Sequence, residues 1–340
     1  MENVYKYLKL FRNIRSRRVK LFGVLSMHLL GHRYIGIFID PTLGCNFRCR
    51  MCYFSDEEKR KSMHGHLNKE EIDRIAQAFF HRALKLQIGC GAEPTLSKHL
   101  AYLIKRGKET GIPYISITTN GGLIDYRKLK EYLDAGLDEV TLSCHGVNKN
   151  TYEHFMPGGN HEHFTKLLGD IARLKKEYPA LNVRINYTMN EDNVEELSEL
   201  PNLLKEASVN VLQVRPIQEL GKTDYHNFSI EHIHSIYEQT LEPLRAYCQA
   251  QGITCIMPTK EDLTKLHESP HPADQYIEDL LYCHISPHSW WHGDFNPQSD
   301  TFESYCKKHN WVWKMIKHIL HPSLTPVHNE VTKRMNYTIK

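Results

Sequence analysis

Three cysteines lie close together after a short apolar run and restrict what this chain can form. The run spans Ile35 to Ile39, and Cys45, Cys49 and Cys52 follow it with the spacing C-x3-C-x2-C. Three thiolates on one loop can converge on a soft metal centre. A closed zinc site needs a fourth ligand nearby, and the next cysteine is Cys90. A [4Fe-4S] cluster normally takes four thiolates, so three leave one iron open to an outside ligand.

This spacing after a first strand resembles the radical S-adenosylmethionine (radical SAM) superfamily. In that family the open iron binds S-adenosylmethionine, and an electron from the cluster cleaves it to a 5′-deoxyadenosyl radical that abstracts hydrogen from a substrate. The resemblance implies that Cys45, Cys49 and Cys52 are the metal ligands, and that a flavodoxin or ferredoxin supplies the electron. Tyr53 is a common choice after the third cysteine, whereas Met51 replaces the usual aromatic residue. A zinc-knuckle fragment or three unrelated thiols is the alternative.

The composition fits a globular protein with reduced cysteines. The chain has 340 residues, of which 41% are hydrophobic and 24% charged. A net charge of +3 argues against a dedicated nucleic-acid-binding protein. Nine cysteines follow a charged N-terminus without a secretory signal, which predicts thiols or metal ligands and not a disulfide framework. Because the cluster is oxygen-sensitive, we expect a cytoplasmic protein.

Residues 1–33 form a basic, partly amphipathic segment. Apolar residues recur at helical spacing among lysines and arginines: Tyr7, Leu8, Leu10, Phe11 and Ile14. One interpretation is a helix that caps one end of the main domain, and we favour it. The other is peripheral attachment to anionic lipid or an acidic partner. The apolar stretch from Leu21 to Leu30 is too short to span a bilayer.

From residue 34 the chain alternates short apolar runs with longer helical patterns, which is typical of parallel β/α units. The predicted strands, rich in Ile and Val and interpreted as buried on both faces, are 34–40, 85–89, 114–119, 139–143, 182–188 and 211–216. This count also permits a doubly wound sheet. The resemblance implies an α/β fold with a partial (β/α)6 TIM-like barrel over 34–225. In both architectures the chemistry lies at the C-terminal ends of the strands.

The region 226–340 is predicted to be an irregular α+β extension, with a helix near 229–250 and a short strand near 253–257. Many superfamily members add a SPASM or twitch module with auxiliary clusters. Four cysteines remain here for a possible second iron–sulfur cluster: Cys248, Cys255, Cys283 and Cys306. The tight C-x2-C pair of such modules is missing, so any SPASM-like region is degenerate.

The second predicted strand ends at Gly91-Ala92-Glu93-Pro94, which resembles the Gly-Gly-Glu-Pro motif of the family. Small residues let the backbone approach a bound amino acid, and a carboxylate or carbonyl accepts from its ammonium group. We therefore expect this segment and the backbone at Tyr53 to bind S-adenosylmethionine. An ordinary strand-to-helix turn is the alternative for this stretch taken alone.

Polar residues also end the third and fourth predicted strands. The third strand ends at Thr118-Thr119-Asn120-Gly121-Gly122, where the family often shows a Thr-Asn-Gly run, and we place Thr118 and Asn120 near cofactor or substrate. Ser143 matches a family serine near the cofactor, while His145 departs from the usual aspartate and is expected to contact substrate. Cys144 is a candidate hydrogen-atom donor to a product radical, although a buried structural thiol is the favoured interpretation.

The fifth and sixth predicted strands supply further candidates for the cofactor or substrate. Arg184 and Asn186 share one strand face. A polar face turned into a barrel would suit a ribose or carboxylate, and an exposed face of the sheet is the alternative. Arg215 ends the sixth strand and is a candidate anion clamp.

These features predict a radical SAM enzyme that acts on a peptide or a small metabolite. A tailoring step on a sugar or lipid is an alternative within the family. A non-catalytic iron–sulfur or zinc-binding protein is the alternative from a different class. No residue identifies the substrate.

Overall fold

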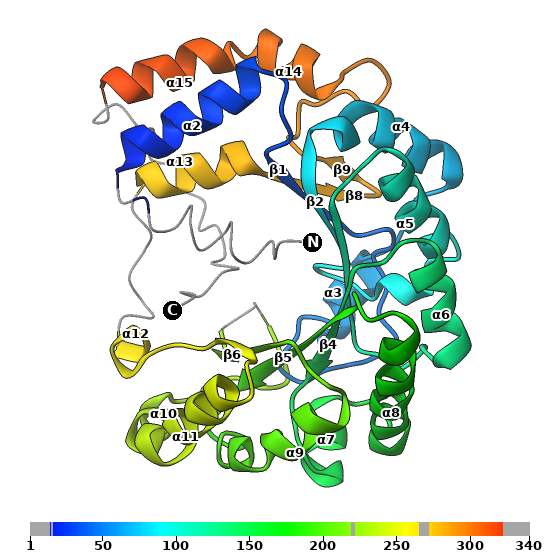
Figure 1. Ribbon diagram of the computed structural model, residues 1–340, viewed down its shortest axis with the longest axis vertical. Helices are drawn as coiled ribbons and strands as arrows, with labels where there is room; N and C mark the ends of the chain where they lie inside the picture. The colour runs from blue at the N-terminus through cyan, green and yellow to red at the C-terminus, as the bar shows by residue number, and fades with distance from the viewer. Residues whose placement is uncertain (1–13, 15, 219–221, 265–271, 322–340) are drawn as a thin grey trace.

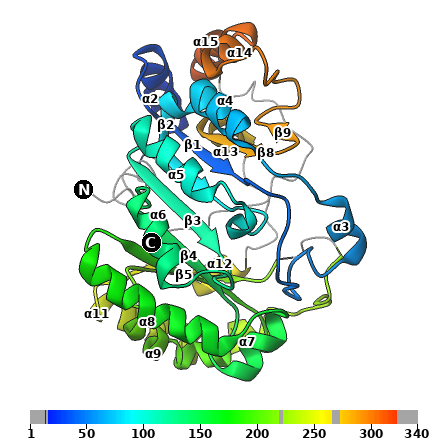
Figure 2. The same cartoon turned by 90° about the vertical axis from the view of Figure 1, so that its right-hand side faces the viewer.

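The computed structural model describes residue 14 and residues 16–218, 222–264 and 272–321, without the side chains of 272–275. These residues form an α/β fold in which a curved sheet makes a partial barrel with helices along its outer side (Figure 1). Turning the view by 90° shows that the cysteine loop and α3 (Glu57–Ser62) lie at the C-terminal ends of the strands (Figure 2).

The sheet has nine strands in the order β7-β6-β5-β4-β3-β2-β1-β8-β9. All neighbours pair in parallel except β8 and β9, which pair antiparallel. The strands are β1 (Ile35–Ile39), β2 (Ala83–Ile88), β3 (Tyr114–Thr119), β4 (Glu139–Cys144), β5 (Asn182–Met189), β6 (Val211–Pro216), β7 (Thr254–Ile256), β8 (Tyr282–Ser286) and β9 (Ser289–Trp290). The first six confirm the predicted strands and their order.

The helices connect the strands and cover the sheet. Their bounds are α2 (Arg17–Leu29), α4 (Lys69–Phe79), α5 (Leu100–Glu109), α6 (Tyr126–Asp134), α7 (Lys149–Phe155), α8 (His161–Glu177), α9 (Leu200–Glu206), α10 (Glu231–Ser235), α11 (Tyr237–Ala250), α12 (Lys260–Thr264), α13 (Pro272–Leu281), α14 (Phe302–Lys308) and α15 (Trp311–Leu320). Short 3-10 helices add η1 (Phe80–Arg82), η2 (Pro94–Leu96) and η3 (Glu195–Ser198). The predicted capping box at Asn68 and Glu71 is present and begins α4.

The two faces of the sheet differ in chemistry because side chains alternate along each strand. One face carries apolar residues such as Leu86, Val140 and Ile185, which join the main core under the helices. The other face carries polar residues, and along β5 it is partly exposed at every second position. The prediction of strands buried on both faces is therefore wrong for β5, and the polar face is the inner face of the barrel.

The C-terminal region adds strands to the same sheet. β7 confirms the predicted short strand and pairs with β6, whereas β8 pairs with β1 and was not predicted. Residue 226 is therefore not a boundary of the sheet. The helix expected near 229–250 is divided into α10 and α11.

Helix α2 lies within the basic N-terminal segment, after the apolar pattern at Tyr7 to Ile14 on which the predicted helix rested. It contacts α15 and α13 and buries Leu21, Val24 and Leu25. The predicted pattern at Tyr7 to Phe11 lies outside the described residues. Among the residues that the structure describes, no helix is long and apolar enough to cross a membrane.

Candidate functional site

The loop that carries the cysteines follows β1 and is fixed to the rest of the barrel. Phe47 lies between two of the cysteines and is 2% exposed. A Cβ atom added at Gly122 would lie 2.6 Å from the Phe47 ring, so this ring fills the space that a side chain would need. The backbone N–H of Arg48 donates to the Pro157 carbonyl at 2.8 Å, and that of Arg50 donates to Phe155 at 3.0 Å. The segment after α7 therefore holds the loop in place.

The three thiols lie close enough to influence one another electrostatically. Burial, with smaller contributions from the charges of Glu93 and Cys52, raises the pKa of Cys45 to about 11. Burial also raises the pKa of Cys49, with Cys52 and Cys45 adding to the effect. A metal would therefore have to displace the protons of Cys45 and Cys49 on binding.

Three cysteines on one loop would supply three of the four thiolates that a [4Fe-4S] cluster normally takes. Within the described ranges, no group of three His, Cys, Asp or Glu side chains is arranged to hold a single metal ion. The three thiols would fit a [4Fe-4S] cluster in which each thiolate binds a different iron and one iron stays open.

Asp40 organises the loop that follows β2. Its carboxylate accepts from the backbone N–H groups of Cys90 at 2.7 Å, Gly91 at 3.0 Å and Ala92 at 3.3 Å. Burial raises the pKa of Asp40, and these three hydrogen bonds oppose that effect. Because the donors of this segment are all directed at Asp40, the segment can offer only carbonyl acceptors to a ligand.

Two contacts join the loop after β2 to the cysteine loop. The Tyr53 hydroxyl donates to the Gly91 carbonyl, and the backbone N–H of Glu93 donates to the Gly44 carbonyl at 2.9 Å. A Cβ atom on Gly91 would lie 2.9 Å from the Tyr53 hydroxyl. The structure thus brings the predicted cofactor residues Tyr53, Gly91 and Ala92 together beside the cysteines.

The Glu93 side chain lies in the interior and links β2 to β3. Its carboxylate accepts from Thr119 Oγ1 at 2.7 Å, from the Asn120 N–H at 2.8 Å and from Thr95 Oγ1 at 2.5 Å. Burial raises its pKa, and these hydrogen bonds lower it. Asn120 in turn directs its Nδ2 to Asn46 Oδ1 at 2.9 Å and to Cys45 Sγ at 3.8 Å. Glu93 therefore positions Asn120 against the cysteine loop through its own hydrogen bonds.

The inner face of the barrel carries a polar network that includes Arg184 and Asn186. Arg184 Nε donates to Asn186 Oδ1 at 3.0 Å, and its guanidinium also donates to Gln213. Lys85 donates to Gln87 Oε1 at 3.2 Å, and burial followed by the nearby Arg184 charge lowers its pKa, while Glu139 raises it.

Further inner-face residues lie nearer the cysteine loop. Thr118 accepts from Gln87 at 3.4 Å, and Ser143 pairs in register with Asn186. This face therefore brings together four predicted residues of the inner barrel: Thr118, Ser143, Arg184 and Asn186.

His145 directly follows β4, and Arg215, the last residue but one of β6, lies near it. His145 Nδ1 accepts from the Thr188 N–H at 3.3 Å. Burial and, secondarily, the Arg215 charge lower the His145 pKa to about 3, so its imidazole is neutral at physiological pH. Arg215 ends β6 as predicted and pairs in register with Thr188.

Cys144 is placed differently from its predicted catalytic role. It belongs to the hydrophobic core, donates to the Gly146 carbonyl at 3.1 Å and is fully buried. Burial raises its pKa to about 12. A hydrogen-atom donor must reach the substrate, and Cys144 lies on the strand face opposite Ser143, so the favoured interpretation of a structural thiol fits and the donor role does not.

The four C-terminal cysteines lie in two separate pairs. Cys248 and Cys255 share a hydrogen bond beside β6 and β7. Cys283 and Cys306 are neighbours beside β1. Six strands separate β7 from β8 in the sheet order. The four thiols therefore do not converge, and these residues do not fit the predicted second cluster.

Sequence reasoning missed several residues that shape the site. Asp40 directly follows β1, so its position at a strand end was an available signal. Lys85 and Glu139 required the strand register before their proximity could be recognised. Asp224 and Tyr225 donate backbone N–H groups to Ser55 and Arg50 at 3.0 Å, and nothing in their sequence spacing indicates this contact.

Comparisons with known proteins agree with this geometry. The family model of the radical SAM superfamily matches residues 39–204, which include the last residue of β1, the cysteine loop and β2 to β5. A probable GTP 3′,8-cyclase of Sulfurisphaera tokodaii is 28% identical over 213 residues, covering 61% of this chain and 64% of that protein. A probable GTP 3′,8-cyclase of Sulfolobus acidocaldarius is 29% identical over 185 residues, covering 54% and 56%. The chain thus spans less than two thirds of the length of these relatives.

Solved structures share the fold at low sequence identity. The crystal structure of Streptococcus suis SuiB bound to S-adenosylmethionine matches with a TM-score of 0.57 at 16% identity, covering 75% of this chain and 59% of that one. SuiB bound to its precursor peptide SuiA matches with a TM-score of 0.57 at 17% identity, covering 85% and 64%. These similarities establish the fold.

Proposed function

Because this chain belongs to the radical SAM superfamily, we propose that it cleaves S-adenosylmethionine reductively and removes a hydrogen atom from a small anionic substrate. The observation that carries the proposal is the junction of the cysteine loop with the loop after β2, made by Tyr53 and Gly91. The three cysteines lie on the loop that this junction joins to a segment whose backbone N–H groups are taken up by Asp40, which leaves its carbonyl groups as acceptors. An ammonium group such as that of S-adenosylmethionine needs such acceptors.

Cys45, Cys49 and Cys52 would hold the [4Fe-4S] cluster, which supplies the electron for cofactor cleavage when bound. The chain contributes the orientation of the cofactor. Asp40 fixes the backbone of Gly91 and Ala92, so their carbonyl groups do not have to be ordered when the ligand binds. Asn120 supplies an amide beside Cys45. A flavodoxin or ferredoxin is the proposed electron donor.

The charges on the inner face favour an anionic substrate. Lys85, Arg184 and Arg215 contribute three cations to the barrel interior, and Glu139 contributes one anion. Guanidinium groups bind phosphate and carboxylate through paired hydrogen bonds. Nucleoside triphosphates belong to this class, and the relatives named as probable GTP 3′,8-cyclases make GTP the first compound to test.

A peptide substrate is the second candidate. It is favoured by the similarity to SuiB, whose structure was solved with its precursor peptide. The polar inner face could also accept a peptide backbone through its hydrogen-bonding side chains. A sugar or lipid substrate and a non-catalytic metal protein remain as alternatives.

The test uses the anaerobically reconstituted full chain with dithionite and S-adenosylmethionine. We expect 5′-deoxyadenosine from the wild type and none from a Cys49→Ala variant. We also expect GTP to increase this production more than an unrelated neutral peptide does. Cofactor cleavage that no anionic compound stimulates would contradict the substrate proposal while leaving the radical SAM activity intact.

A further inference from the structure

Helices α2 and α15 lie side by side at one edge of the molecule (Figures 1 and 2) and expose an unusual number of apolar side chains. Ten large hydrophobic side chains are exposed among the described residues. Seven of them belong to these two helices or to the capping residue of α2: Val19, Phe22, Met27, Leu29, Leu30, Trp313 and Leu320. Phe22 is 63% exposed and Trp313 is 66% exposed. Concentrated exposure of this kind marks an interaction surface.

The exposed apolar residues of α2 lie outside the arc of its buried residues. Leu21, Val24 and Leu25 face the protein, whereas at 100° per residue Val19 falls opposite them and Phe22 and Met27 fall on the two flanks. The arc from Phe22 through Val19 to Met27 is the outer side of α2, and it does not pack against the protein. A capping helix needs only the buried arc, so capping does not explain the apolar residues of the outer side.

Basic residues accompany these exposed side chains. Arg18 and Lys20 lie at the edges of the outer side of α2, and Lys314 and Lys317 lie on α15. Neither helix contains an Asp or Glu residue. The surface is thus apolar and positively charged.

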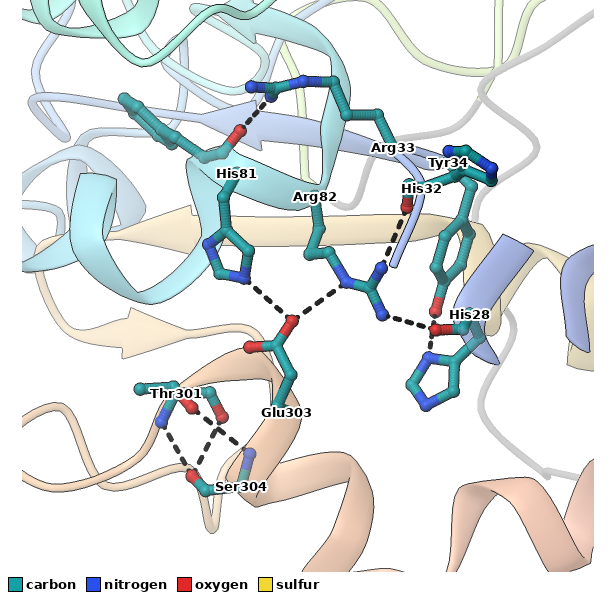
Figure 3. A network of polar contacts seen from close by, with 10 residues as sticks. His28, His32, Arg33, Tyr34, His81, Arg82, Thr301, Glu303 and Ser304 are labelled. Atoms are coloured by element: carbon teal, nitrogen blue, oxygen red, sulfur yellow. Dashed lines mark hydrogen bonds and ion pairs between the residues drawn. The ribbon is translucent and has the colours of Figure 1, made fainter. Parts of the chain in front are cut away.

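A buried arginine clamps α2 to the barrel and to the C-terminal helices (Figure 3). Arg82 donates to the His28 carbonyl at 2.8 Å and to the His32 carbonyl at 3.0 Å. Its Nε forms an ion pair with Glu303 of α14 at 2.9 Å, and His81 contacts the same carboxylate at 2.8 Å. These contacts with the barrel and with α14 fix the orientation of α2, so its outer side faces away from the protein.

We propose that the outer sides of α2 and α15 bind the surface of an anionic lipid bilayer. Interfacial helices combine Trp, Phe and Leu on one side with Lys and Arg at its borders, as these two helices do. Anionic lipid attracts such cations. A second copy of the chain would bring the same cations together, so charge favours lipid over self-association. The clamp lies before β1 and β2, so the membrane would contact the end of the barrel opposite the cysteine loop.

The test measures co-sedimentation of the full chain with vesicles. One set of vesicles contains equal parts of phosphatidylglycerol and phosphatidylcholine, and the other contains phosphatidylcholine alone. We expect binding to the anionic vesicles that weakens as salt increases and is much weaker on neutral vesicles. A Phe22→Ser/Trp313→Ser variant should bind at least about tenfold more weakly, because two apolar side chains no longer enter the interface.

The matched control is a Leu84→Ser/Leu123→Ser variant, which removes two exposed apolar side chains elsewhere. It should bind like the wild type, and circular dichroism should show that both variants are folded. Absence of binding to anionic vesicles would overturn the proposal, as would equal losses in both variants. Self-association that Phe22→Ser/Trp313→Ser abolishes, without vesicle binding, would also overturn it and assign the surface to a second copy.

Discussion

The Tyr53 hydroxyl donates a hydrogen bond to the carbonyl oxygen of Gly91, so the residue after the third cysteine touches the loop that follows β2. Asp40 holds the same loop from the other side through its backbone N–H groups. Gly91 lies between these two side chains and has no room for one of its own.

Replacing Gly91 by alanine should weaken S-adenosylmethionine binding by at least about tenfold, because overpacking of this kind costs about 1–3 kcal/mol. The new Cβ would lie 2.9 Å from the Tyr53 hydroxyl and 3.3 Å from Asp40 Oδ2, so both would have to move. Equilibrium dialysis under anaerobic conditions measures the effect. Gly169→Ala is the control, since nothing lies within 4 Å of that Cβ position in α8. Unchanged binding in Gly91→Ala would mean that the cofactor does not depend on this loop.

Replacing Glu93 by glutamine should destabilise the fold by about 1–3 kcal/mol, since one amide N–H₂ would face donors that now meet a carboxylate. Urea denaturation of the metal-free chain measures this loss. The control is Glu70→Gln on the exposed side of α4, where little change is expected. If both variants unfold alike, the hydrogen bonds of Glu93 do not contribute to stability as described.

The depressed pKa of His145 predicts a pH-dependent stability. Between its usual pKa near 6.5 and its folded pKa of about 3, the unfolded chain binds a proton that the folded chain does not. The contribution of His145 to the free energy of unfolding is therefore fully present above pH 6.5, and it decreases as the pH falls toward the folded pKa. The contribution lost by pH 5 is roughly 1–2 kcal/mol.

A His145→Asn variant tests this prediction, because Asn keeps an acceptor for the Thr188 N–H but does not titrate. Its stability should fall less than that of the wild type between pH 7 and pH 5 in urea titrations. A variant of the exposed His66, also changed to Asn, should follow the wild type. Parallel pH curves for wild type and His145→Asn would show that His145 protonates freely in the folded chain.

Replacing Arg215 by glutamine should raise the KM for an anionic substrate about tenfold, through the loss of a charge-assisted hydrogen bond. The readout is GTP-stimulated production of 5′-deoxyadenosine. The exposed Arg127, changed to Gln, serves as the control on α6. An unchanged KM would remove Arg215 from the substrate site.

Replacing both Cys248 and Cys283 by alanine should leave the iron content unchanged, because the C-terminal thiols form two distant pairs. The wild type should hold about four irons after reconstitution, the content of one cubane cluster. Iron counting and electron paramagnetic resonance of the reduced protein distinguish the outcomes. About eight irons, reduced to four in the double variant, would show that a second cluster forms despite this separation.

The sequence patterns predict the order of the first six strands because each has a local signal, an apolar run bounded by helical periodicity. They do not predict β8, whose residues Tyr282 to Ser286 contain polar and aromatic side chains and which pairs with the distant β1. Such long-range pairing is determined by tertiary packing and leaves little trace in local composition. The same limit applies to the C-terminal cysteines, whose separation depends on which sheet edge each pair joins.

Within the site, motif spacing identified the three cysteines and the segment Gly91 to Glu93 because both are continuous in sequence. Motif spacing could not reveal that the Glu93 carboxylate accepts hydrogen bonds from Thr119 and Asn120, because these bonds connect the end of one strand to the end of the next. The favoured interpretation of Cys144 as a buried structural thiol agrees with its place in the core, one position along the strand from Ser143 and therefore on the opposite face.

The most direct test of the account is cofactor cleavage by the reconstituted full chain with dithionite, compared between wild type and a Cys45→Ala/Cys49→Ala/Cys52→Ala variant. The account predicts about four irons and 5′-deoxyadenosine in the wild type, and neither in the variant. A wild type that binds zinc without iron, or that binds iron but releases no 5′-deoxyadenosine, would contradict it.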